Sequence, residues 1–66
     1  MRLTANSKTY DVDPGTTVDS FIRSRGLDPK LVVVEHNGEA LLRSRYEATR
    51  LEDGDRLELV RAVAGG

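Results

Sequence analysis

The chain contains no cysteine, and this absence leaves a sequence of 66 residues with one source of stability. Disulfide bonds and thiolate metal sites are both excluded, so a single hydrophobic core must hold the fold together. A chain this short buries only about 60% of its unfolded surface, which allows a thin core and no deep pocket. We therefore expect residues 1–66 to form one small domain. There is also no thiol to act as a nucleophile or redox centre.

The charged residues are numerous but balanced. Ten Lys and Arg interleave with eleven Asp and Glu, and the formal net charge is −1. A nucleic-acid-binding face needs a clustered positive field, so we expect protein partners and no nucleic acid. The longest apolar run, residues 31–34, is too short to span a bilayer, and residues 1–4 lack the apolar region of a signal peptide. These features predict no membrane association and a cytoplasmic location.

Two strand-like segments, residues 2–6 and 8–12, open the chain. Asn6 and Ser7 lie between them and suit a tight turn, so this pattern predicts a β-hairpin. The Asp-Pro-Gly sequence at residues 13–15 then breaks the second strand.

A helix is predicted to begin within residues 16–19, where a threonine hydroxyl can cap the first turn and an aspartate lies three residues further on, as in a variant of the capping box. Val18, Phe21 and Ile22 then share one face of the helix, which predicts a buried stripe. Gly26 follows at the position where helices commonly end in a left-handed residue.

Residues 31–36 are rich in β-branched side chains and predict a central strand. Asn37 and Gly38 come directly after it and form the strongest short signal for a hairpin, so residues 39–42 should return antiparallel.

The last third of the chain has a weaker pattern. Residues 43–50 show no clear period and predict a connecting segment with one helical turn. Residues 52–55 predict a second tight turn, and residues 56–63 a final strand.

The alternation within this final strand is irregular. Leu57 and Leu59 share one face, whereas Val60 and Ala62 lie on the other face with Glu58. Either a bulge or an edge strand accounts for this pattern, or the strand carries an exposed apolar patch that marks a partner site.

Candidate catalytic side chains are few. His36 is the only histidine and ends a predicted strand, where we expect it to be exposed or packed against the turn. Glu52, Asp53 and Asp55 are acidic but lack the twelve-residue spacing of a calcium loop, so we expect a solvated turn and no metal site. A lone histidine without cysteine is a poor basis for catalysis, and the chain has no glycine-rich phosphate loop. We therefore expect a protein that is not an enzyme and does not itself bind ATP.

The sequence ends in Gly65 and Gly66. Two residues without a Cβ form the thinnest tail that a polypeptide can present, able to enter a narrow active site. Activation by ATP would convert the carboxylate of Gly66 into an acyl-adenylate, which sulfur or an amine can attack. This terminus is therefore predicted to be a substrate of another protein, and a frayed end without a chemical role is the alternative.

Four segments carry a family resemblance, in the same order along the chain. Residues 34–39 have the form V-x-x-N-G, Tyr46 lies in the connecting segment, residues 51–55 have the form L-x-x-G-D, and residues 60–66 form a closing strand with a G-G end. Together they resemble the ThiS family of ubiquitin-like β-grasp sulfur carriers. The resemblance implies an α+β fold, in which a mixed sheet of four to five strands packs on one helix and residues 63–66 form a flexible, extended tail.

The resemblance also implies a function. A ThiF-like enzyme would use ATP to adenylate Gly66, and a persulfide sulfur donor would convert the product into a thiocarboxylate. Thiazole synthase, ThiG, would then receive this sulfur for the thiazole moiety of thiamin. Gly65 and Ala64 would enter the partner active site, and Val63 and Val60 would be docking contacts.

Three alternatives remain open. The small subunit of molybdopterin synthase has the same fold and thiocarboxylate chemistry. A protein modifier would be joined through Gly66 to lysines of its targets. An ordinary interaction domain would carry its terminal glycines without a chemical role.

Overall fold

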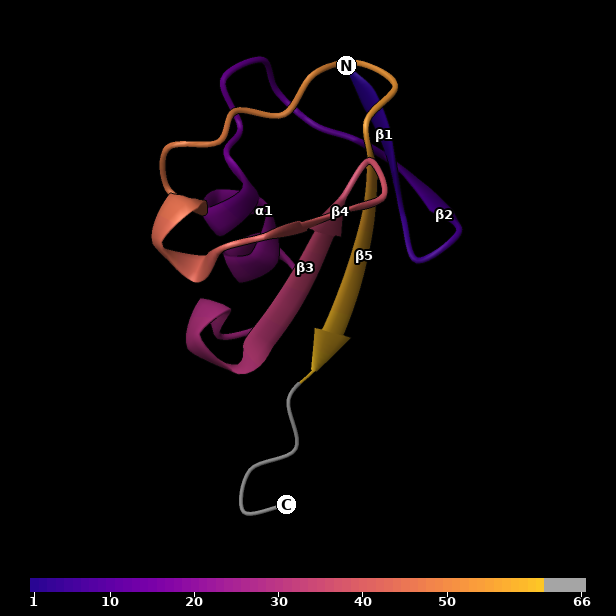
Figure 1. The fold of residues 1–66 in the computed structure, drawn as a ribbon. Helices are drawn as coiled ribbons and strands as arrows, with labels where there is room; N and C mark the ends of the chain where they lie inside the picture. The colour runs from indigo at the N-terminus through magenta and orange to yellow at the C-terminus, as the bar shows by residue number, and fades with distance from the viewer. Residues whose placement is uncertain (62–66) are drawn as a thin grey trace.

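A computed structural model describes residues 1–61 of the chain (Figure 1). Within these residues, five strands and one helix follow one another in the order β-β-α-β-β-β, with two short 3₁₀ turns. The elements are β1 (Arg2–Ala5), β2 (Lys8–Asp11), α1 (Val18–Ser24), a 3₁₀ turn (Pro29–Leu31), β3 (Val32–His36), β4 (Glu39–Leu41), a second 3₁₀ turn (Arg43–Arg45) and β5 (Arg56–Arg61).

The five strands form one mixed sheet in the order β2-β1-β5-β3-β4. β1 and β5 are parallel, and the other neighbouring strands are antiparallel. Figure 1 shows β3 and β5 side by side, with the described end of β5 close to the start of β3. β3 is therefore an interior strand next to the centre, and β5 is the central strand. The suggestion that the final strand is an edge strand is wrong, because β5 has a hydrogen-bonded neighbour on each side.

The N-terminal hairpin is confirmed. β1 and β2 pair antiparallel up to Ala5 opposite Lys8, and the turn consists of Asn6 and Ser7. Both turn residues have positive φ, +50° and +70°. A two-residue turn of this kind matches the twist of the strands that it joins, and Asn tolerates the left-handed conformation well.

The start of α1 lies one residue later than the sequence pattern predicts. Thr17 caps the helix: its hydroxyl accepts a hydrogen bond from the Ser20 amide at 3.1 Å, and the Ser20 hydroxyl accepts one from the Thr17 amide at 2.9 Å. Ser20, and not Asp19, therefore completes the capping box. Thr16 does not cap the helix, because its hydroxyl donates to the carbonyl of Asp13 at 2.7 Å.

The helix ends at the predicted glycine. Gly26 has φ of +75°, which suits a residue without a Cβ. Its amide donates to the carbonyl of Arg23 at 3.0 Å, and the amide of Leu27 donates to that of Ile22 at 3.2 Å. These are the two hydrogen bonds of a Schellman motif, so the last carbonyls of this short helix are satisfied locally.

The predicted turns of the second half are also confirmed. Asn37 and Gly38, with φ of +53° and +84°, join β3 to β4. The turn before β5 contains Gly54 at φ of +88°. The single helical turn predicted within residues 43–50 is the 3₁₀ turn Arg43–Arg45.

The core lies between α1 and one face of the sheet. The predicted stripe of Val18, Phe21 and Ile22 is at most 1% exposed. Tyr46, in the connecting segment, is 2% exposed, and its hydroxyl donates to the carbonyl of Val32 at 2.7 Å. The remaining buried apolar residues are Leu3, Ala5, Val32, Val34, Leu51 and Leu57. A mixed five-stranded sheet covered by one helix is the ubiquitin-like β-grasp fold.

Candidate functional site

Five residues are predicted from the sequence to form the site, and the structure describes one of them. Val60 is the second-last residue of β5. Val63, Ala64, Gly65 and Gly66 lie outside the described residues, so the docking contact predicted for Val63 and the roles of the last three residues in a partner active site remain sequence-based predictions.

Val60 belongs to an exposed apolar row on the face of the sheet that α1 does not cover. Within β5, Leu57 is buried and Val60 is 60% exposed, as expected for a strand whose alternate side chains face opposite sides. Val60 pairs across the strands with Val33, which is 49% exposed. Continuing the β3–β4 register by one residue places Leu42, 71% exposed, beside Val33. We call Val60, Val33 and Leu42 the apolar row.

The apolar row explains the irregular pattern of the final strand. β5 pairs with β3 in unbroken register as far as Arg61 opposite Val32, so no bulge is present in this part of the chain. Leu59 faces the core and is partly buried, whereas Val60 faces outward. Exposed apolar side chains gathered on one face of a small protein are typical of an interaction surface.

Asn6 fixes the end of β5 that leads to residues 62–66. Its Oδ1 accepts a hydrogen bond from the amide of Leu59 at 2.8 Å, and its Nδ2 donates to the carbonyl of Leu59 at 3.1 Å. The amide of Asn6 donates to the carbonyl of Leu57 at 3.0 Å. β1 ends at Ala5, so no backbone of β1 lies opposite Leu59. The amide side chain of Asn6 takes the place of that backbone and extends the hydrogen bonding between β1 and β5 to Leu59.

Asp55 is the centre of a polar cluster beneath the β3–β4 turn. It is 9% exposed, and its carboxylate accepts hydrogen bonds from Nε2 of His36 at 2.9 Å, Nδ2 of Asn37 at 3.1 Å and the amide of Glu52 at 2.8 Å. The expectation of a solvated turn is therefore wrong for Asp55, although Glu52 and Asp53 are exposed. The His36 side chain contacts Asp55 beneath the β3–β4 turn. Of the two expectations for His36, exposure or packing against that turn, the second is confirmed.

The ionisation of Asp55 is set by two opposing effects. Burial raises the pKa of its carboxyl group, but the hydrogen bonds from His36, the Glu52 amide and Asn37 favour the charged form and together lower the pKa below the ordinary value. Asn37 also accepts a hydrogen bond from the amide of Arg56 at 2.9 Å. The cluster therefore joins the turn after β3 to the first residue of β5 and has a structural role.

Two further observations concern residues 1–61. They contain no group of three or more His, Asp or Glu side chains arranged to hold a metal ion. None of the helices in this part of the chain is long and apolar enough to cross a membrane.

Sequence reasoning missed Val33, Leu42 and Asn6. The signal for Val33 was available, because alternate residues of the apolar run 31–34 must face opposite sides of a sheet, and a single helix covers only one side. Leu42 and Asn6 carry no such signal, since their roles depend on strands that are distant in the sequence.

The ThiS family model matches residues 1–66 of the chain. Over these 66 residues the chain is 35% identical to the sulfur carrier protein ThiS of Bacillus subtilis and covers 98% of its length. The crystal structure of the thiamine biosynthesis protein ThiS from Geobacter metallireducens is similar at a TM-score of 0.83, with 35% sequence identity and each chain covered completely.

A further relative is a much longer protein. The chain is 33% identical over 66 residues to the thiazole synthase of Paramagnetospirillum magneticum, but it spans only 20% of the length of that protein. The family match and the solved structure, in contrast, both extend over all 66 residues. This chain therefore belongs to the ThiS family.

Proposed function

We propose that this chain is a sulfur carrier of thiamin biosynthesis and not an enzyme, with the carboxylate of Gly66 as the group that carries sulfur. The main support is the match to the ThiS family over the whole chain, together with the name of the Bacillus relative. One fifth of a thiazole synthase is similar to this chain. This similarity supports thiazole synthase as the enzyme that accepts the sulfur. Because activation consumes ATP, the carrier would act in the cytoplasm.

The proposed chemistry takes place on a partner enzyme. A ThiF-like enzyme transfers the adenylyl group of ATP to the Gly66 carboxylate and releases pyrophosphate. The terminal sulfur of a persulfide then attacks the acyl carbon and AMP leaves. Reduction of the remaining S–S bond by a thiol leaves a thiocarboxylate on Gly66. Residues 1–61 supply no group to these steps and provide the surface on which the partners bind the carrier.

The apolar row is suited to be this docking surface. Val60 lies one residue before the end of β5, on the face of the sheet that the helix leaves open. Five residues follow Arg61 in the sequence, and a fully extended segment of that length spans at most about 18 Å. A partner that docks on the apolar row must therefore have its reactive site within about this distance of the end of β5.

The intact mass of the protein isolated from its native host, grown with and without thiamin, tests this proposal. We expect a species that is heavier by the difference between sulfur and oxygen, localised to Gly66 and enriched when thiamin is withheld. Sulfur that does not respond to thiamin would favour another sulfur pathway, and adducts linked to lysines would favour a protein modifier. Either result would contradict the proposal.

Variants of the tail give a second test. Deleting Gly66, or replacing Gly65 by Phe, should abolish adenylation by the cognate enzyme. Thermal unfolding should remain unchanged, because both residues follow the core elements in the sequence. Ala48→Gly, at an exposed position distant in sequence, is a control that should leave adenylation intact.

A further inference from the structure

Two carboxylates lie directly opposite each other beside the apolar row. Glu35 of β3 pairs across the strands with Glu58 of β5, and both side chains are exposed on the face that α1 leaves open. Like charges in this arrangement repel each other and destabilise a sheet. The ion pairs formed within residues 1–61 involve neither glutamate, so neither carboxylate has a direct cationic partner in this part of the chain.

The position of the pair indicates a role in recognition. Val33 and Val60 lie two residues from Glu35 and Glu58 along the same strands, so the carboxylates border the apolar row on the same face. The two glutamates also line a shallow hollow of about 260 Å³. The other residues that line it are Thr4, Ser7, Gly38, Arg56 and Leu57.

A metal ion and a second copy of the chain fit this hollow poorly. No third His, Asp or Glu of the described residues joins the pair in a metal-binding group. A second copy packed on the same face would bring two more glutamates into the interface and increase its excess of negative charge. Arg56 lines the hollow, but it forms no ion pair with Glu35 or Glu58, and one positive charge leaves the site with a net negative charge.

We propose that Glu35 and Glu58 together bind an arginine side chain of the protein partner that docks on the apolar row. A guanidinium group presents several N–H donors in a fixed fork, which can serve two neighbouring carboxylates at once. Its charge would also remove the repulsion between the glutamates, so the pair becomes favourable only in the complex. This proposal rests on the proposed function, because it assigns the recognition surface of the same carrier.

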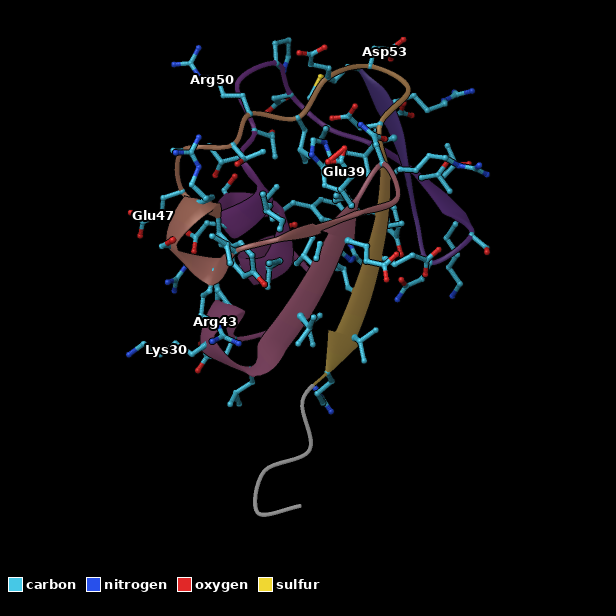
Figure 2. All side chains as sticks on the ribbon, in the orientation of Figure 1. Lys30, Glu39, Arg43, Glu47, Arg50 and Asp53 are labelled. Atoms are coloured by element: carbon cyan, nitrogen blue, oxygen red, sulfur yellow. The ribbon has the colours of Figure 1, made fainter. Side chains whose placement is uncertain are left out.

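Binding measurements with charge-neutral variants test the proposal. The variants are Glu35→Gln, Glu58→Gln and the double substitution. Glu47→Gln is the control, because it removes the same charge from an exposed position beside the second 3₁₀ turn, away from β5 (Figure 2). Calorimetric titrations with the cognate adenylating enzyme and with the cognate thiazole synthase, each at low and high salt, would give the affinities.

We expect the double variant to lose about ten- to a hundredfold in affinity for at least one partner at low salt, as charged hydrogen bonds are removed. The control should stay within about twofold, since it alters only the net charge. The affinity of the unaltered protein should fall with salt more steeply than that of the double variant. Equal losses for the double variant and the control, or a loss that does not depend on salt, would overturn the proposal.

Three controls separate the possible causes of a result. Thermal unfolding of the glutamine variants should occur at the same or a slightly higher temperature, because repulsion is relieved, so weaker binding cannot come from unfolding. Sedimentation of the free chain should show a monomer, and a dimer that Val60→Ser dissociates would assign this face to a second copy. If the unaltered protein carries sulfur on Gly66 but the variants bind normally, only the arginine site is wrong. If it carries no sulfur and binds neither partner, both proposals fail.

Discussion

Asp55 shows how one residue can join parts of the chain that are distant in sequence. It accepts a hydrogen bond from Asn37, 18 positions earlier, and another from the amide of Glu52 within its own turn. The sequence motif predicts the turn, because Gly54 and its acidic neighbours are local signals. It does not predict the burial of Asp55, which depends on where Asn37 and His36 lie in the fold.

Replacing Asp55 by Asn should destabilise the protein at neutral pH by about 1.5–3 kcal/mol, because the charged acceptor of three hydrogen bonds is lost. Urea denaturation at pH 7 measures this difference. Glu52→Gln is the control, since the Glu52 side chain is exposed and only its amide contacts Asp55. Equal stability of the two variants would contradict the role assigned to Asp55.

The same residue predicts a dependence on pH. Its pKa is lower in the folded protein than the ordinary value of 3.8, so the unfolded chain binds the proton more readily. Asp55 therefore stabilises the fold fully above about pH 4 to 5, and this contribution is lost as the pH falls through the folded-state pKa. The stability difference between the unaltered protein and Asp55→Asn should shrink below pH 3.8. Thermal unfolding from pH 7 to pH 2.5 tests this, and a constant difference would contradict it.

At the scale of the elements, local signals fixed the turns and the helix. Asn37 and Gly38 make a two-residue turn wherever the flanking residues form strands, and Gly26 ends α1 by the same backbone preference. The order of the strands could not be predicted in this way. β1 pairs with β5 so that Thr4 lies opposite Arg56. These residues are far apart in the sequence, and a local pattern cannot predict such a contact.

Asn6 provides a test of how the end of β5 is held. Asn6→Gly keeps the positive φ of the turn but removes the side chain that bonds both backbone groups of Leu59. We expect the amide of Leu59 to exchange its hydrogen about five times faster or more, because one hydrogen bond is worth about 1 kcal/mol or more when it cannot be replaced. Exchange measured by NMR, residue by residue, gives this rate.

Ser7→Gly is the matched control for this experiment. It also places glycine at a positive φ, in the same turn, but Ser7 makes no side-chain hydrogen bond to Leu59. The exchange of the Leu59 amide should therefore remain slow in this variant. Acceleration of equal size in both variants would show that the turn, and not the Asn6 side chain, protects β5.

At the scale of the whole molecule, stability depends on one thin core. Phe21 is 1% exposed, and the ring of Tyr10 packs edge-on against it at 5.4 Å between centroids. Phe21→Ala should cost about 3–5 kcal/mol, a large part of the stability expected of so small a protein. Chemical denaturation measures the loss. Leu42→Ala, at a side chain that is 71% exposed, should change stability little, and similar losses in both variants would contradict this view of the core.

The whole molecule also shows which parts of the site the sequence could predict. The elements and the buried stripe of α1 follow from patterns along the chain, and the expected fold followed from the resemblance to the ThiS family. The apolar row does not, because it gathers Val60 of β5, Val33 of β3 and Leu42, which directly follows β4, and only the sheet order brings these residues together. The alternation of side chains along a strand identifies the residues that face away from the core. Which residues of other strands lie beside them depends on the order of the strands in the sheet.

The central position of β5 has a consequence for the synthesis of the chain. Without residues 56–61, β1 and β2 form one hairpin, β3 and β4 form another, and no strand joins them. A nascent chain at that stage has two separate halves of a sheet and an incomplete core. Folding must therefore wait until β5 has left the ribosome, and a truncated product that stops before Arg56 should be recognised as unfolded and degraded. The chain can therefore fold only after the ribosome has synthesised β5, the strand that directly precedes residues 62–66.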